Sequence, residues 1–210
     1  MHILLDKDTK IDKMDDDSSP PLIKACSLGQ YSRVHFLLNN KADVNITDVN
    51  GWSPLVVACE ERYEDIVKLL VHNRAKVNET RNYWLTPLMA ACKSGNPSIV
   101  QFLICNGVYV NKGSKDGRTS LHVACEHGFN DIVYILIRNG ANVNKRVSVN
   151  FKCDRIVNSV IGNDGETPLI CACRMKHEKI VHLLLENGTN TNKMDATGLT
   201  PLMRLWLLVE

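Results

Sequence analysis

Cysteine and histidine are the side chains of this sequence best suited to chemistry. The chain holds eight cysteines and seven histidines, residue types that supply most zinc ligands and many nucleophiles and general bases. Cys171-Ala172-Cys173 looks like half of a metal-binding motif, but no second pair accompanies it, and the histidines are scattered over unrelated positions. No glycine-rich phosphate loop is present. The sequence therefore predicts no catalytic site, no metal site and no cofactor, and we expect a protein that is not an enzyme.

Most of the cysteines mark an internal repeat. Five of them follow an alanine, at intervals of 33, 33, 33 and 48 residues: Cys26, Cys59, Cys92, Cys125 and Cys173. The same intervals separate the Pro-Leu (once Ser-Leu) steps that begin at residues 21, 54, 87, 120, 168 and 201, and the asparagines at 45, 78, 111, 144 and 192. The interval of 48 is the period of 33 plus a 15-residue insertion. A fixed period of this length predicts stacked supersecondary units that share one continuous core.

The residue types within one period predict two helices and a turn. Ser53 and Thr86 stand before proline as helix N-caps, and Gly95 follows where a left-handed backbone would end the first helix. Arg62 and Lys176 occupy that glycine position in their own units, which should cost up to about 1 kcal/mol if the backbone is the same. A second helix follows with apolar residues at the spacing of one buried face.

These residues resemble the ankyrin repeat family. Thr86-Pro87-Leu88-Met89-Ala90-Ala91 and Thr119-Ser120-Leu121-His122-Val123-Ala124 are similar to the opening of its repeat, and Asn139-Gly140-Ala141-Asn142-Val143-Asn144 to the close. The resemblance covers essentially the whole chain except the insertion. It implies an all-α solenoid of stacked helix-turn-helix units with projecting β-hairpin turns, which binds other proteins and does not catalyse reactions.

In such a stack the cysteine series is expected to be structural. Packed helices lie ~8–10 Å apart, whereas a disulfide needs Cα atoms within ~7 Å of one another. We therefore expect small, buried thiols that let the first helices approach closely. Cys105 and Cys153, outside the series, should be accessible to solvent.

The period divides residues 1–210 into one array with five full repeats. These cover residues 13–45, 46–78, 79–111, 112–144 and 145–192, the last with an insertion near 145–161, and half-repeats at 1–12 and 193–210 flank them. Asp12 falls on the position of Asn45. Alternating apolar and polar residues predict that the insertion is an enlarged hairpin. We expect the last helix to expose apolar residues and to permit self-association, and a fragment of a longer array remains an alternative to a complete chain.

Residues that break the period in exposed positions are the candidates for partner contacts. Trp52 and Tyr83-Trp84 place aromatic side chains at two neighbouring hairpin tips, and Tyr109 stands where other repeats have polar residues. In the resembled family, tip and first-helix positions usually make the contacts. Here these positions carry Asn50, Trp52, Glu60, Glu61, Tyr83, Trp84, Leu85, Lys93, Arg118, Glu126 and His127. The alternative is that Trp52 and Trp84 fold back onto the stack and only cover it.

Charge and hydropathy narrow the class of partner and the location. The formal net charge is +2, from 25 basic and 23 acidic residues, which gives no electrostatic footprint for nucleic acid. No apolar run reaches membrane-spanning length, and the first ten residues lack the apolar core of a signal peptide. We expect a cytoplasmic protein, with the nucleus as the alternative.

Two functional hypotheses remain open. In the first, the chain is a non-enzymatic scaffold that binds another protein, of mixed surface charge, through its concave face and hairpin tips. In the second, it is the targeting or recognition part of a larger multidomain enzyme, receptor or channel.

Overall fold

Alternating short helices make up the protein. A computed structural model describes residues 11–14, 19–79, 85–147 and 165–207. Within these ranges there are eleven helices and no strand. The first helices of the repeats are α1 (Pro21–Ser27), α3 (Pro54–Glu60), α5 (Pro87–Ser94), α7 (Ser120–His127), α9 (Pro168–Arg174) and α11 (Pro201–Trp206). The second helices are α2 (Tyr31–Asn39), α4 (Glu64–His72), α6 (Pro97–Cys105), α8 (Asn130–Arg138) and α10 (Glu178–Glu186).

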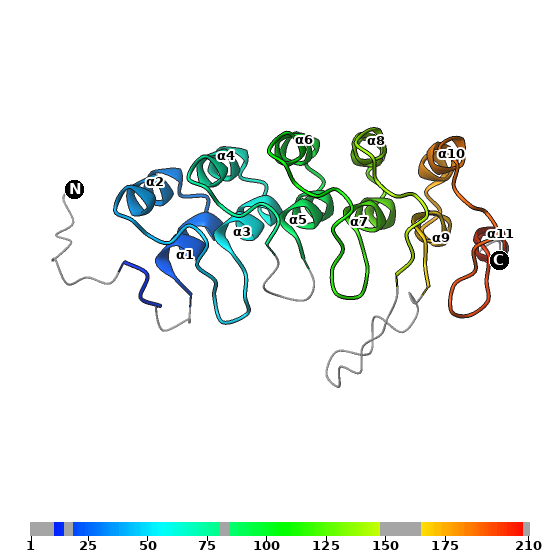
Figure 1. Cartoon of the computed structure of the whole chain (residues 1–210), viewed down its shortest axis with the longest axis horizontal. Coiled ribbons are helices and arrows are strands. Elements are labelled where there is room, and N and C mark those ends of the chain that lie inside the picture. Colours follow the sequence, from blue (N-terminus) through cyan, green and yellow to red (C-terminus); the bar gives the residue numbers. More distant parts are fainter. Residues whose placement is uncertain (1–10, 15–18, 80–84, 148–164, 208–210) are drawn as a thin grey trace.

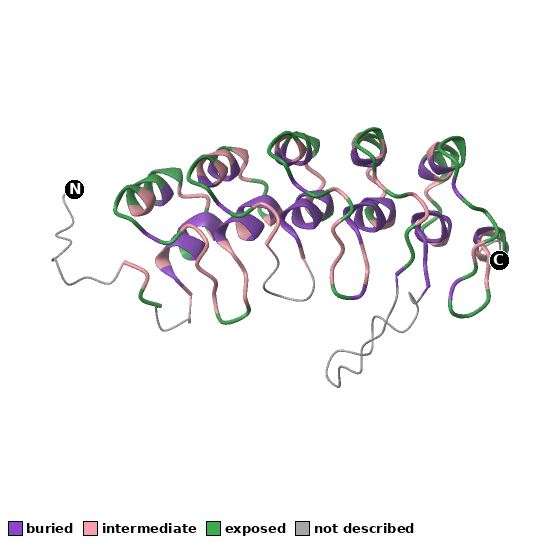
Figure 2. Ribbon diagram, in the orientation of Figure 1, coloured by how far each residue is buried: buried purple, intermediate pink, exposed green. Residues whose placement is uncertain are grey.

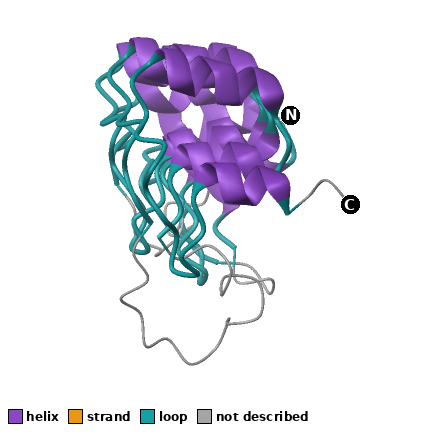
Figure 3. Ribbon diagram, turned by 90° about the vertical axis from the view of Figure 1, so that its right-hand side faces the viewer, coloured by secondary structure: helices purple, strands orange, loops and turns teal. Residues whose placement is uncertain are grey.

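The helices form two parallel rows. Each first helix packs against the first helices before and after it and against its own second helix. The rows arch gently, with the second helices on the convex side and the connecting loops projecting from the concave side (Figure 1). The view along the stack shows the described parts of the projecting loops on one side of the helices (Figure 3). The prediction of an all-α repeat solenoid is confirmed.

Capping residues begin the first helices as expected. The side-chain oxygens of Ser53, Thr86, Thr167 and Thr200 accept hydrogen bonds from the N–H three residues later, at 3.0–3.4 Å. Proline follows each of them at the first helical position, where its missing N–H costs nothing. Local sequence thus fixes where each repeat's first helix starts.

The core lies mainly along the first helices, which are the most buried part of the stack (Figure 2). The alanine–cysteine pairs at their centres are at most 3% exposed. Each second helix adds one apolar face, such as Ile66, Val67 and Leu70 of α4. Because no repeat has a core of its own, stability comes from the contacts between neighbours.

The periodic asparagines connect each repeat to the next. The Oδ1 atom of Asn78 accepts the N–H of Tyr109 at 2.7 Å, and its Nδ2 donates to the carbonyl of Gly107 at 2.9 Å. Asn111 makes the same two bonds to the following repeat, at 2.7 and 2.8 Å. Asp12 accepts the N–H of Asp43 at 3.2 Å, so residue 12 does occupy the asparagine position predicted from the period.

The projecting loops are closed by hairpin-type hydrogen bonds. Asp48 N–H donates to the Trp52 carbonyl at 3.1 Å, and Gly51 N–H donates to the Asp48 carbonyl at 2.9 Å. Val147 pairs with Glu166 and Gly165 in the same way, at 2.9 and 3.0 Å. Val147, Gly165 and Glu166 therefore correspond to Asp48, Gly51 and Trp52 of a regular repeat. The predicted bounds of the insertion, near 145–161, stay a prediction. The predicted hairpin itself lies outside the described residues.

Left-handed residues end the first helices and receive a side chain from the next repeat. Gly29, Gly95 and Gly128 have φ of +66°, +72° and +78°. A Cβ on them would lie 2.5–2.6 Å from a ring of the following repeat, namely Tyr63, Phe129 and His177 respectively. Arg62 and Lys176 have φ of 67° and 59°, so these two residues do adopt the left-handed backbone for which a cost was predicted. Arg62 is tolerated because the next repeat has Asn96 in place of a ring.

Replacing Gly95 by alanine should therefore destabilise the protein more than its backbone conformation alone requires. We expect Gly95→Ala to lower the free energy of unfolding by roughly 2 kcal/mol or more, because left-handed strain costs about 1 kcal/mol and the Phe129 ring must also move. Gly107→Ala is the matched control: its φ is +80°, but nothing lies within 4 Å of the added Cβ. Urea unfolding measures both, and equal losses for the two variants would contradict the role of Phe129.

Candidate partner-binding surface

The predicted contact residues differ widely in exposure. Asn50 and Glu61 are exposed, and Tyr109 is 68% exposed on the segment that follows α6. Trp52 and Leu85 are half-buried and pack against the core, so each side chain covers the stack and still presents a surface. Tyr83 and Trp84 lie outside the described residues.

An ion pair between neighbouring repeats uses two of the predicted contact residues. The Lys93 Nζ lies 2.7 Å from the Glu60 Oε1, and the two side chains are 46% and 26% exposed. A pair of this exposure contributes little to stability. Both groups therefore remain available for a partner at small cost.

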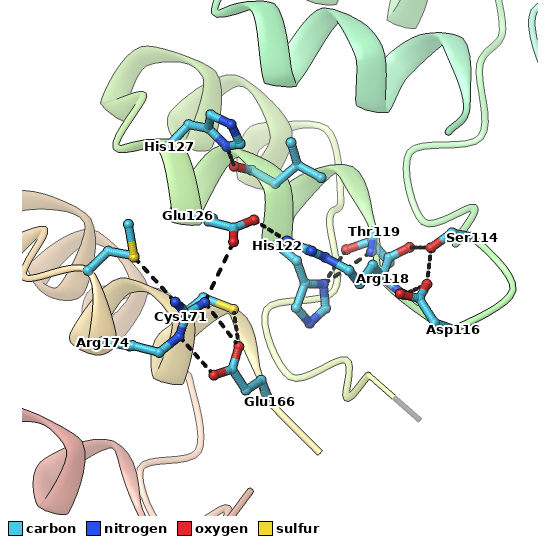
Figure 4. Close-up of polar contacts among 12 residues, drawn as sticks. Ser114, Asp116, Arg118, Thr119, His122, Glu126, His127, Glu166, Cys171 and Arg174 are labelled. Carbon is cyan, nitrogen blue, oxygen red and sulfur yellow. Dashed lines mark hydrogen bonds and ion pairs between the residues drawn. The ribbon is translucent and has the colours of Figure 1, made fainter. Parts of the chain in front are cut away.

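A longer polar network joins the fourth and fifth repeats (Figure 4). Arg118, at the base of a projecting loop, pairs with Glu126 of α7. The other oxygen of Glu126 lies 3.7 Å from Arg174 Nη2 of α9, and Arg174 Nε pairs with Glu166 Oε1 at 3.0 Å. The network spans two loops and two first helices. Arg118 and Glu126 are therefore already paired within the stack and are less available to a binding partner.

Glu166 is the most buried member of the network. Its side chain is 1% exposed, and its second oxygen accepts a hydrogen bond from the Cys171 thiol at 3.1 Å. Burial, and after it the Glu166 charge, raises the pKa of Cys171 well above its usual value. Breaking such a buried pair by removing one partner costs about 3–5 kcal/mol. Cys171 is thus a buried member of this polar cluster.

Sequence reasoning missed Glu166, Arg174 and Cys171 as a cluster. A signal was present: Arg118 and Glu126 are eight residues apart, and Glu166 and Arg174 occupy the same two positions of the next repeat with the charges reversed. Opposite charges at equivalent positions of adjacent repeats indicate pairing between repeats.

His122 is buried and structural, as expected from its position in the repeat. Its Nδ1 accepts the N–H of Thr119 at 3.2 Å, and the residue is 0% exposed. Burial, and to a smaller extent the Arg118 charge, lowers the pKa of His122 from 6.5 to about 4. The ring is therefore neutral at physiological pH. His127, by contrast, is exposed, and a ring nitrogen contacts the Val123 carbonyl at 3.0 Å.

The first two repeats expose large apolar side chains on the loop side of the stack. Leu28 is 56% exposed and Val49 is 66% exposed. In the fourth and fifth repeats the equivalents of Leu28 are His127, which is also exposed, and Met175, which is 40% exposed. These two repeats differ in their larger network of Arg118, Glu126, Arg174 and Glu166, whereas Glu60 and Lys93 form an exposed pair. The loop side of the first three repeats, called the open part below, is therefore the better candidate for contacts with another molecule.

Neither a metal centre nor a membrane span emerges from the described structure. Among the described residues, no three His, Cys, Asp or Glu side chains are grouped to hold a metal ion. None of the described helices is both long enough and apolar enough to cross a membrane.

Fold and surface together define a helical repeat protein built as a stack of two-helix units. The family model described as ankyrin repeats (3 copies) matches residues 1–81, 74–147 and 148–205. The chain therefore belongs to the ankyrin repeat family. Ankyrin repeats are generally modules for protein–protein interaction and are typically non-catalytic. A comparison with curated proteins gave no match.

The cysteines should divide into slow and fast thiols in a labelling experiment. Cys26, Cys59, Cys92, Cys125, Cys171 and Cys173 are buried, whereas Cys105 is exposed. Burial also raises the thiol pKa, to about 12 for Cys26 and about 11 for Cys173, so little reactive thiolate forms. We expect Cys105 to react within minutes under native conditions and the buried six only on unfolding; Cys153, also predicted to be accessible, lies outside the described residues. Mass spectrometry of labelled peptides measures the rate at each thiol, with Cys105→Ser as the control. Fast labelling of Cys59 or Cys92 in the folded protein would contradict their burial.

The lowered pKa of His122 predicts a loss of stability in mild acid. An unfolded chain protonates this ring below about pH 6.5, whereas the folded protein does so only near pH 4. The unfolding free energy should therefore fall by up to about 1.4 kcal/mol per pH unit between these values, and not change from this cause above pH 6.5. His122→Gln should show a correspondingly shallower slope in urea unfolding at pH 7 and 5. An NMR titration in which His122 protonates above pH 6 would refute the assignment.

Proposed function

We propose that the chain is a non-enzymatic scaffold that binds another protein on its concave side, through the loop tips and first helices of the first three repeats. The observation that carries the proposal is the contrast along this side. Apolar Leu28 and Val49 and acidic Glu61 are exposed in the first two repeats, whereas in the fourth and fifth repeats four charged residues form one network.

The residues predicted from the sequence contribute to the proposed contact set with different weights. Asn50, Trp52, Glu60, Glu61, Leu85 and Lys93, together with Tyr83 and Trp84, form its centre, because their described members lie in the open part. Tyr109, Arg118, Glu126 and His127 form its margin. A partner that contacted Arg118 and Glu126 would have to break their ion pair. Leaving one charge of such a pair without its partner carries a free-energy penalty, which would offset part of the gain from the new contact.

The mixed charge of this surface favours a partner that is neither strongly acidic nor strongly basic. Glu60 and Lys93 lie side by side, and Glu61 is exposed beside them. A protein surface with apolar side chains and scattered charges suits this better than nucleic acid, which requires a continuous basic surface. The cytoplasm is the proposed location.

The last helix supports a secondary proposal of self-association. Leu202, Trp206 and Leu207 of α11 and its C-terminal cap are 65%, 76% and 65% exposed. The equivalents of Leu202 in the five preceding repeats are at most 1% exposed. Exposed apolar surface of this kind favours contact with a second copy.

A comparative pull-down tests the main proposal. Proteins bound by the wild type should be depleted at least tenfold by the Trp52/Tyr83/Trp84 triple alanine variant and by Val49→Asp, because hot-spot truncation costs about 2 kcal/mol or more. Lys179→Ala, on the exposed surface of α10, should retain them. Thermal unfolding of each variant separates lost binding from lost folding. Capture that is unchanged in the tip variants but lost in Lys179→Ala would overturn the proposal.

A further inference from the structure

The central repeat is depleted of charge. Residues 79–111 contain three charged residues, Glu79, Arg81 and Lys93, whereas the units at 46–78 and 112–144 contain nine and seven. Glu79 pairs with Lys76 at 2.9 Å, and Lys93 pairs with Glu60. Charge depletion combined with aromatic residues distinguishes the centre of protein interfaces from other surface.

The depletion extends to the convex side of the stack. Helix α6 has no charged residue in its nine positions, and its exposed residues are Pro97, Ser98, Gln101 and Cys105. The residue of α8 equivalent to Gln101 is Tyr134, which is 54% exposed. This convex surface lies on the opposite side of the molecule from the projecting loops (Figure 3), so the proposed binding surface does not explain it.

The arrangement of charge at the two ends of α8 suggests what covers this surface. Asp131 lies in the first turn of α8 and Arg138 in the last. Both side chains are exposed, and neither makes an ion pair within the described parts of the chain. If a second α8 packed antiparallel to the first, Asp131 would face Arg138 of the second copy at both ends.

We propose that the exposed faces of α6 and α8 form a homodimer interface. The two-fold axis would lie between the two copies, parallel to the row of second helices, so that α6 packs antiparallel to α6 and α8 antiparallel to α8. A residue near such an axis contacts the same residue of the second copy. A charged residue there would therefore lie against a charge of the same sign. The two central positions are uncharged: Gln101 would meet Gln101 and Tyr134 would meet Tyr134. The neighbouring equivalents, Lys68 of α4 and His182 of α10, are less suited to the axis.

The shape of the stack places the contact at this point. The second helices form an arch with α6 and α8 near its crest (Figure 1), and two convex surfaces touch where they bulge most. Two helices a side bury roughly 1,000 Å² or less, at the low end of specific interfaces. The dimer should accordingly be weak, with a dissociation constant on the order of micromolar or above.

Sedimentation velocity of the full chain, from about 5 to 200 µM, tests the proposal. The wild type should show a concentration-dependent dimer. Gln101→Glu places like charges on the axis, and Arg138→Asp places one opposite Asp131, so each should weaken the dimer by about tenfold or more. The double variant Asp131→Arg/Arg138→Asp restores the complementary pairing and should dimerise within about threefold of the wild type.

Matched controls separate this interface from others. His182→Glu introduces the same charge at the equivalent position of α10, away from the crest, and should leave dimerisation unchanged. Trp206→Asp removes association through α11 and should also have no effect on this dimer. A wild type that stays monomeric to 200 µM, a charge swap that fails to restore the dimer, or a dimer lost only in Trp206→Asp would each overturn the proposal. Thermal unfolding verifies that every variant is folded.

Discussion

One directional side-chain contact recurs between consecutive repeats and constrains how each repeat is registered on the next. An asparagine in the segment after each second helix bonds to the backbone of the next repeat. Close packing of alanine and cysteine along the first helices sets how near the repeats can lie, and interdigitating side chains already limit their offset. The asparagine restricts that offset further because an amide hydrogen bond is directional. The pairing of Glu60 with Lys93, and of Arg174 with Glu126, requires the same offset.

Most of the fold could be predicted because its determinants are local. The N-cap hydroxyl followed by proline begins a helix through contacts within four residues, and a residue with positive φ ends it nearby. The period extended the helix prediction along the chain, and it placed Asp12 at the position of the periodic asparagines, where Asp12 does accept a bond from the next repeat. The position of the insertion was less certain, because residues 145–147 fit either a regular unit or the start of an extra segment. The bonds of Val147 to Gly165 and Glu166 match those of a regular loop, a correspondence that depends on residues far apart in the sequence.

Features that depend on two repeats at once were harder to predict. The role of Glu166 becomes clear only from its contacts with Arg174 and Cys171 and from the contact of Arg174 with Glu126 of another repeat. None of these residues, taken alone in the sequence, indicates a buried polar cluster. Trp52 shows the same limitation, since its half-buried position depends on the loop conformation set by Asp48. The predicted contact residues remain a proposal, because a binding surface is defined by a partner as well as by its own side chains.

The contact between a left-handed glycine and a ring in the next repeat has a consequence for how such an array can be rearranged. A unit that carries Tyr63, Phe129 or His177 can follow only a unit whose first helix ends in glycine, whereas the unit with Asn96 can follow Arg62. The repeats are therefore not interchangeable modules. Deleting the unit between Arg62 and Phe129, or recombining units in another sequence, would place a ring against a Cβ. These pairwise compatibilities exclude many orders of the units. Tandem duplication of a unit adds a junction of that unit with itself, so duplicating the unit that carries both Arg62 and Tyr63 would also place a ring against a Cβ.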